Sequence, residues 1–151
     1  MKKELTLNYA HFDSLREVAE DDLEVIRAAK RATDKAHAPY SHFHVGAAAR
    51  LRSGKILSAS NFESEVYPAG LCAERSLLFF LESNHADDPI VSFAIASVPD
   101  ERECYPCGQC RQVLVDVERR QGVPFRIYMC GADSATMVSS AETLLPFTFI
   151  L

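Results

Sequence analysis

The stretch Ile-Val-Ser-Phe-Ala-Ile-Ala-Ser-Val, residues 90–98, decides the fold class, because it is almost continuously apolar. A strand with one solvent-facing side alternates apolar and polar residues, whereas an unbroken apolar run is typical of a strand buried on both faces. Burial on both faces requires other elements to cover each side of the sheet. The sequence therefore predicts a sheet with helices packed on its faces.

The segments around this run predict the other strands of that sheet. Residues 43–51 and 56–62 are expected to form a hairpin joined by a tight turn at Ser53-Gly54. Residues 125–130 predict another strand. The alternation of helices and strands after the hairpin indicates a mixed sheet.

Three helical segments separate these strands. Apolar residues at helical spacing predict one long helix or two short ones over residues 14–36, ended by Pro39. Further helices are expected over residues 71–82 and 107–120, and a helical turn near 143–145. The length of 151 residues favours a single domain, residues 1–151.

Composition narrows the function. Apolar residues make up 48% and charged residues 25%, as in ordinary globular proteins. The net charge of -5, without a long basic run, disfavours a nucleic-acid partner and favours a small, roughly neutral ligand. No window resembles a membrane span, and the segment Met1–Glu4 lacks the apolar core of a secretory signal. We expect a cytoplasmic protein that contacts no membrane.

The five cysteines suggest a metal site rather than disulfides, because their number is odd and a reducing compartment is expected. Two motifs stand out. They are Cys72-Ala73-Glu74-Arg75 and Pro106-Cys107-Gly108-Gln109-Cys110, each at a break that precedes a predicted helix. Free N–H groups and the positive dipole end at a helix start stabilise thiolates.

Together these motifs predict a catalytic zinc site. Cys107 and Cys110 can reach one metal ion from a single helical turn, and Cys72 would add a third thiolate. Three protein ligands leave one tetrahedral position open for water, whose proton the neighbouring Glu74 could accept. The alternative is a structural zinc site with a fourth ligand from Cys104, Cys130 or a histidine. The Cys-Ala-Glu motif ahead of Pro-Cys-x-x-Cys favours catalysis.

These motifs belong to a wider resemblance. From Pro39 to Phe149 the chain is similar to the small cytidine deaminases. The similarity rests on blocks in matching order, namely Pro39–Ala48, Asn61–Glu63, Cys72–Arg75, Pro106–Val113 and Leu144–Pro146.

The resemblance implies a fold and a reaction. The fold is a three-layer α/β/α sandwich with a mixed five-stranded sheet, carrying one Zn²⁺ per subunit. The reaction is the hydrolysis of cytidine or 2′-deoxycytidine to uridine or 2′-deoxyuridine plus ammonia, as in pyrimidine salvage. A homo-oligomer, either a tetramer or a dimer, is also implied.

The resemblance further implies the residues that contact the substrate. Asn61 and Glu63 would bind the sugar hydroxyls, and Tyr67 would cover the sugar. Phe43 would lie against the pyrimidine ring, although a phenylalanine at a strand start is often plain core. The backbone of Ala73 would contact the base.

Three more residues have roles implied by the resemblance. Arg75 would donate to a thiolate and offset the net charge of about -1 on zinc with three thiolates. Arg111 would assist in the same region. Phe149, or the nearby Phe147, would reach a neighbouring subunit's site, or else dock on its own core.

The loop Ser64–Gly70 departs from the family's usual sequence after the Asn-x-Glu motif. Its extra acid, Glu65, disfavours a phosphorylated substrate. The loop leaves the preference between ribose and deoxyribose open. It also leaves two alternatives: a deaminase of a modified cytosine nucleoside or nucleoside antibiotic, and a non-catalytic zinc-binding relative.

Overall fold

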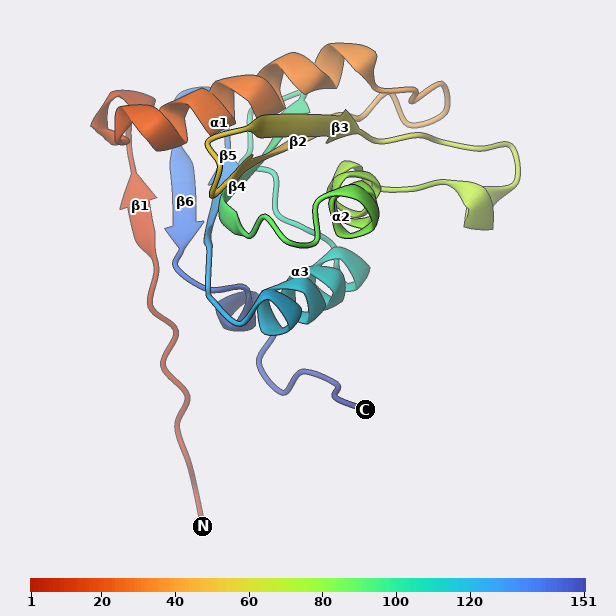
Figure 1. Cartoon of the computed structure of the whole chain (residues 1–151). Coiled ribbons are helices and arrows are strands. Elements are labelled where there is room, and N and C mark those ends of the chain that lie inside the picture. Colours follow the sequence, from red (N-terminus) through yellow and green to blue (C-terminus); the bar gives the residue numbers. More distant parts are fainter.

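A computed structural model describes all 151 residues and shows one mixed sheet of six strands covered by helices on both faces (Figure 1). The strands, in their order across the sheet, are β1 (Ala10–Phe12), β6 (Ala135–Val138), β5 (Arg126–Cys130), β4 (Ile90–Val98), β2 (His44–Leu51) and β3 (Ile56–Ser60). The three α-helices are α1 (Glu20–Ala32), α2 (Ala73–Asn84) and α3 (Gly108–Gln121).

The apolar run at residues 90–98 forms the inner strand β4, as predicted. β4 pairs in parallel with β5 and antiparallel with β2, so the sheet is mixed. Phe93 and Ile95 contribute to the core beneath α2 and α3, whereas Ala94 and Ala96 contribute to the core beneath α1. The strand is therefore buried on both faces, and the predicted three-layer arrangement is confirmed.

The expectation of five strands was wrong, because the sheet has six. The sequence did not predict the strands β1 and β6, which pair with each other at one edge of the sheet. They contain three and four residues, too few for an alternating pattern to identify. β1 pairs only with β6, from the other end of the chain, whereas β6 also pairs with the neighbouring strand β5.

The first helical segment is also subdivided. Residues Leu15–Glu17 and Thr33–Lys35 form 3-10 turns on either side of α1. Gly46 of β2 allows α1 to lie directly on the sheet, since a Cβ at this position would be 2.1 Å from the carbonyl oxygen of Ala29. Close contact between the helix and the sheet therefore requires a residue without a side chain here.

A buried polar cluster anchors α1 to β5. Asp22 accepts two hydrogen bonds from Arg126, at 2.9 Å each, and one from the hydroxyl of Tyr128 at 2.6 Å. Burial acts to raise the pKa of Asp22, but these hydrogen bonds and the charge of Arg126 outweigh it and lower the pKa. The carboxylate is thus held ionised inside the fold.

No α-helix combines the length and the apolar character that crossing a bilayer demands.

Candidate active site

The cysteines of the two motifs lie at the starts of two helices that pack together on one face of the sheet (Figure 1). Cys72 is the residue that caps the N-terminus of α2, and Cys107 caps α3. Cys110 lies in the first turn of α3. Because the first N–H groups of a helix have no partner within it, both helices direct positive potential toward these sulfurs.

The three sulfurs have the spacing of a zinc site. The Sγ atoms of Cys72 and Cys107 are 3.9 Å apart, and those of Cys107 and Cys110 are 3.5 Å apart. All three lie within 4.8 Å of one another. Tetrahedral zinc with Zn–S distances of about 2.3 Å separates neighbouring sulfurs by about 3.8 Å. The donor set and its geometry fit a zinc ion.

The other two cysteines lie outside this cluster. Cys104 and Cys130 are buried, and burial raises the pKa of their thiols to about 11 and about 12. Neither sulfur belongs to the group of three that lie within 4.8 Å of one another. The cluster itself therefore consists of three protein ligands, which is the number typical of a catalytic zinc site.

Arg75 contacts the cluster from the first turn of α2. Its Nη2 atom donates to the Sγ atom of Cys72 at 3.6 Å. The hydrogen bond from Cys110, together with Arg75, lowers the pKa of Cys72 to about 5. Cys72 is therefore a thiolate at neutral pH, ready to bind a cation.

Glu74 lies beside the cluster with its side chain buried. Only 4% of the residue is exposed, and burial, reinforced by the charge of Cys72, raises the pKa of Glu74 to about 7. A carboxyl group with a pKa near the working pH can both accept and deliver protons. Its burial thus gives Glu74 the properties of a general acid and base.

A cavity of about 510 Å³ opens next to Cys72, large enough for a nucleoside-sized ligand. Its wall brings together the three residues that were expected to contact the sugar, Asn61, Glu63 and Tyr67. The remaining lining residues are Tyr40, Ser41, Phe62, Ser64, Gly70, Leu71, Cys72 and Arg75.

Asn61 and Glu63 are both held by backbone groups. The Asn61 amide accepts from Val45 N at 2.8 Å and donates to Phe43 O at 3.0 Å, which joins it to the start of β2. The Glu63 carboxylate accepts from the N–H groups of Tyr40 and Ser41 at 3.2 and 3.1 Å. Each side chain keeps unused hydrogen-bonding capacity for a ligand.

Tyr40 and Ser41 were not singled out from the sequence. They belong to the turn that precedes β2, and their backbone N–H groups, not their side chains, hold Glu63. The turn-forming sequence after Pro39 was the available signal. Opposite it, Tyr67 is largely exposed, and its ring meets the ring of Tyr40 edge-on at 6.4 Å.

Other sequence-predicted residues lie away from this cavity. Phe43 is 41% exposed and lines an adjacent cavity of about 330 Å³ with Cys104. Arg111 donates to the carbonyls of Pro106 and Leu144, at 2.8 and 3.0 Å, and so braces the loop before α3.

The C-terminal phenylalanines also lie outside the cavity of their own chain. Phe149 is exposed, and its carbonyl accepts from Gln112 of α3 at 3.3 Å. Phe147 is almost fully exposed. Ala73, in contrast, is buried in the first turn of α2 beside Cys72.

Comparison with known proteins agrees with this geometry. A family profile described as the cytidine and deoxycytidylate deaminase zinc-binding region matches residues 19–125. The cytidine deaminase of Halalkalibacterium halodurans is 39% identical over 83% of this chain and 91% of its own. The probable cytidine deaminase of Dictyostelium discoideum is 34% identical over 86% of this chain and 85% of its own.

A solved structure extends the similarity to three dimensions. The crystal structure of cytidine deaminase from Burkholderia pseudomallei superimposes with a TM-score of 0.72 at 33% identity, covering 83% of this chain and 97% of that one. The residues matched by the profile include the two cysteine motifs and the strands β2, β3 and β4. This chain therefore belongs to the cytidine and deoxycytidylate deaminase family.

Proposed function

We propose that this protein is a zinc-dependent hydrolase that deaminates cytidine and 2′-deoxycytidine in pyrimidine salvage. The observation that carries the proposal is the trio of sulfurs at tetrahedral spacing, next to a buried glutamic acid whose pKa is near 7. Membership of the family and the nucleoside-sized cavity beside Cys72 support the same reaction.

In this proposal Cys72, Cys107 and Cys110 hold one zinc ion per chain. Zinc bound there supplies a Lewis acid that makes water nucleophilic near neutral pH. Arg75 donates to the Cys72 sulfur and offsets part of the negative charge of the three thiolates. That compensation matters because an uncompensated negative charge would make the attacking water less acidic.

Glu74 is assigned the proton transfers. It accepts one proton from the attacking water as the oxygen bonds to C4 of the cytosine ring, and later the remaining hydroxyl proton of the C4 adduct as the C4–N bond breaks. It returns protons first to the ring nitrogen N3 and then to the amine, so that ammonia leaves and C4 keeps the oxygen as a carbonyl. The pKa near 7 supports both directions of transfer.

The substrate contacts are part of the same proposal. Asn61 and Glu63 bind the sugar hydroxyls, and Tyr67 covers the sugar from the opposite wall of the cavity. The first backbone N–H groups of α2, beginning with Ala73, are free to bind the pyrimidine carbonyl. Phe43 lines the other cavity, together with Cys104, rather than the cavity beside Cys72. We therefore propose that it contacts only the edge of the pyrimidine ring.

We also propose that the protein is cytoplasmic. Its chains are proposed to form a homo-oligomer, most simply a tetramer. The exposure of Phe147, Phe149 and the residues after them supports this assignment, because an apolar tail is stabilised when another subunit covers it. Phe149 would then complete a neighbouring subunit's cavity. Arg111 supports this tail by holding the carbonyl of Leu144.

The test combines kinetics with metal analysis on one sample. The protein is expected to contain one zinc per chain and to deaminate cytidine and deoxycytidine. The reaction is monitored by the loss of the substrate's ultraviolet absorbance. The substrate panel includes modified cytosine nucleosides, because the Ser64–Gly70 loop lines the cavity. Zinc-loaded protein that turns over no cytosine nucleoside would refute the proposal.

A further inference from the structure

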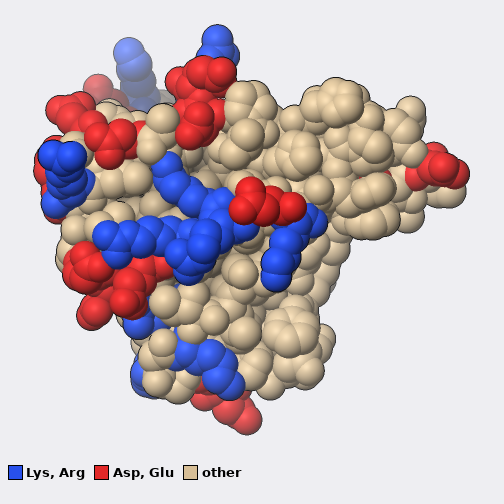
Figure 2. All heavy atoms as spheres, turned by 90° about the horizontal axis from the view of Figure 1, so that it is seen from above, with Lys and Arg blue, Asp and Glu red and all other residues tan.

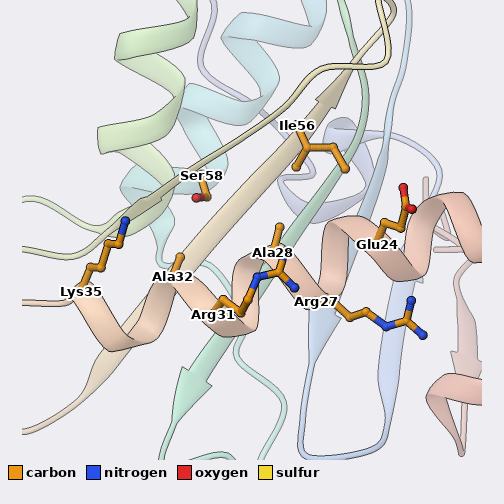
Figure 3. Close-up of a pocket in the computed structure, with 8 residues that line it drawn as sticks. All are labelled: Glu24, Arg27, Ala28, Arg31, Ala32, Lys35, Ile56 and Ser58. Atoms are coloured by element: carbon orange, nitrogen blue, oxygen red, sulfur yellow. The ribbon is translucent and has the colours of Figure 1, made fainter.

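A second cavity, of about 690 Å³, lies on the opposite face of the sheet from the cysteine cluster (Figure 3). We call it the α1–β3 groove. It runs between helix α1 and the edge strand β3, and its volume is in the range of small-molecule sites. Its lining residues are Glu24, Arg27, Ala28, Arg31, Ala32, Lys35, Ile56 and Ser58.

Basic side chains dominate one wall of this groove. Arg27 and Arg31 lie one turn apart on α1, about 6 Å along the helix, and Lys35 follows in the 3-10 turn Thr33–Lys35. In Figure 3 the Lys35 side chain extends toward β3, and Arg31 lies beside Ala28. Viewed from the α1 side, Lys and Arg side chains gather over part of the surface, with Asp and Glu side chains beside them (Figure 2).

Two of these cations lack an acidic partner. Arg27 pairs with Glu20 at 2.6 Å, and Glu24 is paired with Arg50 instead. No carboxylate lies within ion-pair distance of Arg31 or Lys35. Like charges at i and i+4 repel each other, so an anion in the groove would relieve a local cost. The protein's net charge of -5 makes this local surplus of positive charge more distinctive.

The opposite wall adds hydrogen-bond donors. Backbone hydrogen bonds join Asn61 to Val45 and Leu51 to Lys55 at the two ends of the β2–β3 pair. In this register the N–H and C=O groups of the odd-numbered β3 residues point toward β2. Backbone groups therefore alternate, and the N–H of Ser58 points to the free edge of the sheet. Ser58 also exposes its hydroxyl in the groove. The floor, formed by Ala28, Ala32 and Ile56, is apolar.

We propose that the α1–β3 groove binds an oligophosphate anion, with Arg31 and Lys35 as its principal charge partners and Ser58 as a hydrogen-bond donor. A row of cations matches a linear anion that carries several charges, whereas a single carboxylate or orthophosphate would neutralise only one position. The apolar floor could receive a nucleoside attached to the phosphate chain. The site is separate from the cavity beside Cys72, because the sheet lies between them.

A nucleic acid fits the groove less well. The basic row has three members, and Glu20 and Glu24 occupy the preceding turns of the same helix. A nucleic-acid backbone gains affinity from many phosphate contacts, and the acidic residues would repel its continuation. A short anion held by Arg31 and Lys35 neutralises the unpaired cations, while Glu24, which also lines the groove, is paired with Arg50.

The test is calorimetric titration of the zinc-loaded protein with inorganic tripolyphosphate at low ionic strength. Saturable binding at one site per chain is expected, with orthophosphate at least tenfold weaker. A parallel titration with a nucleoside triphosphate shows whether an attached nucleoside adds affinity. Zinc content is measured after each titration, because these anions chelate metals.

Matched variants locate the site. The double variant Arg31→Gln/Lys35→Gln and the single variant Ser58→Asp should each weaken tripolyphosphate binding at least tenfold. The double variant Lys2→Gln/Lys3→Gln removes the same charge from the exposed N-terminal segment and should change affinity less than twofold. Thermal unfolding and cytidine deamination, measured on every variant, verify that the fold and the cysteine site are intact.

Three results would overturn the proposal. They are the absence of saturable binding, equal weakening in the Lys2/Lys3 control, and tighter binding of an oligonucleotide or an acidic peptide than of tripolyphosphate. Because deamination is measured separately, failure of this site would leave the proposed activity untouched.

Discussion

The guanidinium of Arg75 lies 3.6 Å from the sulfur of Cys72, one helical turn away at the start of α2. This contact joins two residues of a single motif, so the helix itself sets the geometry. The hydrogen bond from Cys110, which contributes most, and this contact with Arg75 together lower the pKa of Cys72 to about 5. The same contact supplies the first prediction.

Replacing Arg75 with Gln should lower kcat/KM for cytidine about 10- to 100-fold, the usual effect of removing a group that supports a metal ligand. Without the positive charge the pKa of Cys72 rises, so zinc binding should weaken most below neutral pH, where protons compete for the thiolate. Zinc affinity measured between pH 5 and 8 (roughly the range of protein stability) checks this. Arg75→Lys should recover part of the loss, and an Arg75→Gln affinity with the same pH dependence as wild type would contradict the assignment.

Replacing Glu74 with Gln should reduce kcat by about 10²–10⁴-fold or more, because the amide cannot carry a proton between water and substrate. Zinc content should stay at the wild-type level, since the three sulfurs are unchanged. Metal analysis and steady-state kinetics on the same preparation test both parts. Loss of zinc together with activity would show that Glu74 acts on the metal site rather than on protons.

The five cysteines should separate into two groups by metal analysis. Cys110→Ala is expected to abolish tight zinc binding and activity, because it removes one of three ligands. The double variant Cys104→Ser/Cys130→Ala should keep its zinc, since both residues lie outside the cluster, although the buried hydroxyl and the lost volume lower stability. Release of zinc from that double variant would indicate a structural site with four protein ligands.

Asp22 should make stability depend on acidity. Asp22→Asn is expected to cost about 2 kcal/mol at neutral pH, because charge-assisted hydrogen bonds from Arg126 and Tyr128 are weakened. The folded pKa of Asp22 is below its ordinary value of 3.8, so this stabilisation is present above that value and is lost as the pH falls through the folded pKa.

Urea unfolding of wild type and Asp22→Asn, from neutral pH to below 3.8, tests this pH dependence of stability. The difference in the free energy of unfolding should be largest at neutral pH and should shrink under acidic conditions. The surface variant Asp13→Asn serves as the control, because Asp13 is almost fully exposed and should show little effect at any pH. A difference that grows on acidification would contradict the ionised state of buried Asp22.

The sequence alone determined the parts of the protein that depend on local pattern. The apolar run at 90–98 identified the inner strand, because burial on both faces leaves no room for polar alternation. The motifs at Cys72 and Cys107 marked two helix starts, because a break followed by an apolar helical pattern is readable within a few residues. The choice of the three cysteines as ligands and of Glu74 as proton carrier rested on the match to the zinc-deaminase signature, and it stays a prediction.

Only the tertiary structure decided the relations between distant segments. The 3.9 Å separation of the Cys72 and Cys107 sulfurs depends on how α2 packs against α3, and the strand β1 forms through its pairing with β6 from the other end of the chain. The attachment of Asn61 to β2, and the groove between α1 and β3, depend likewise on segments far apart along the chain. Local periodicity reports which face of an element is buried, whereas long-range packing selects its neighbours, and no short window of sequence contains that choice.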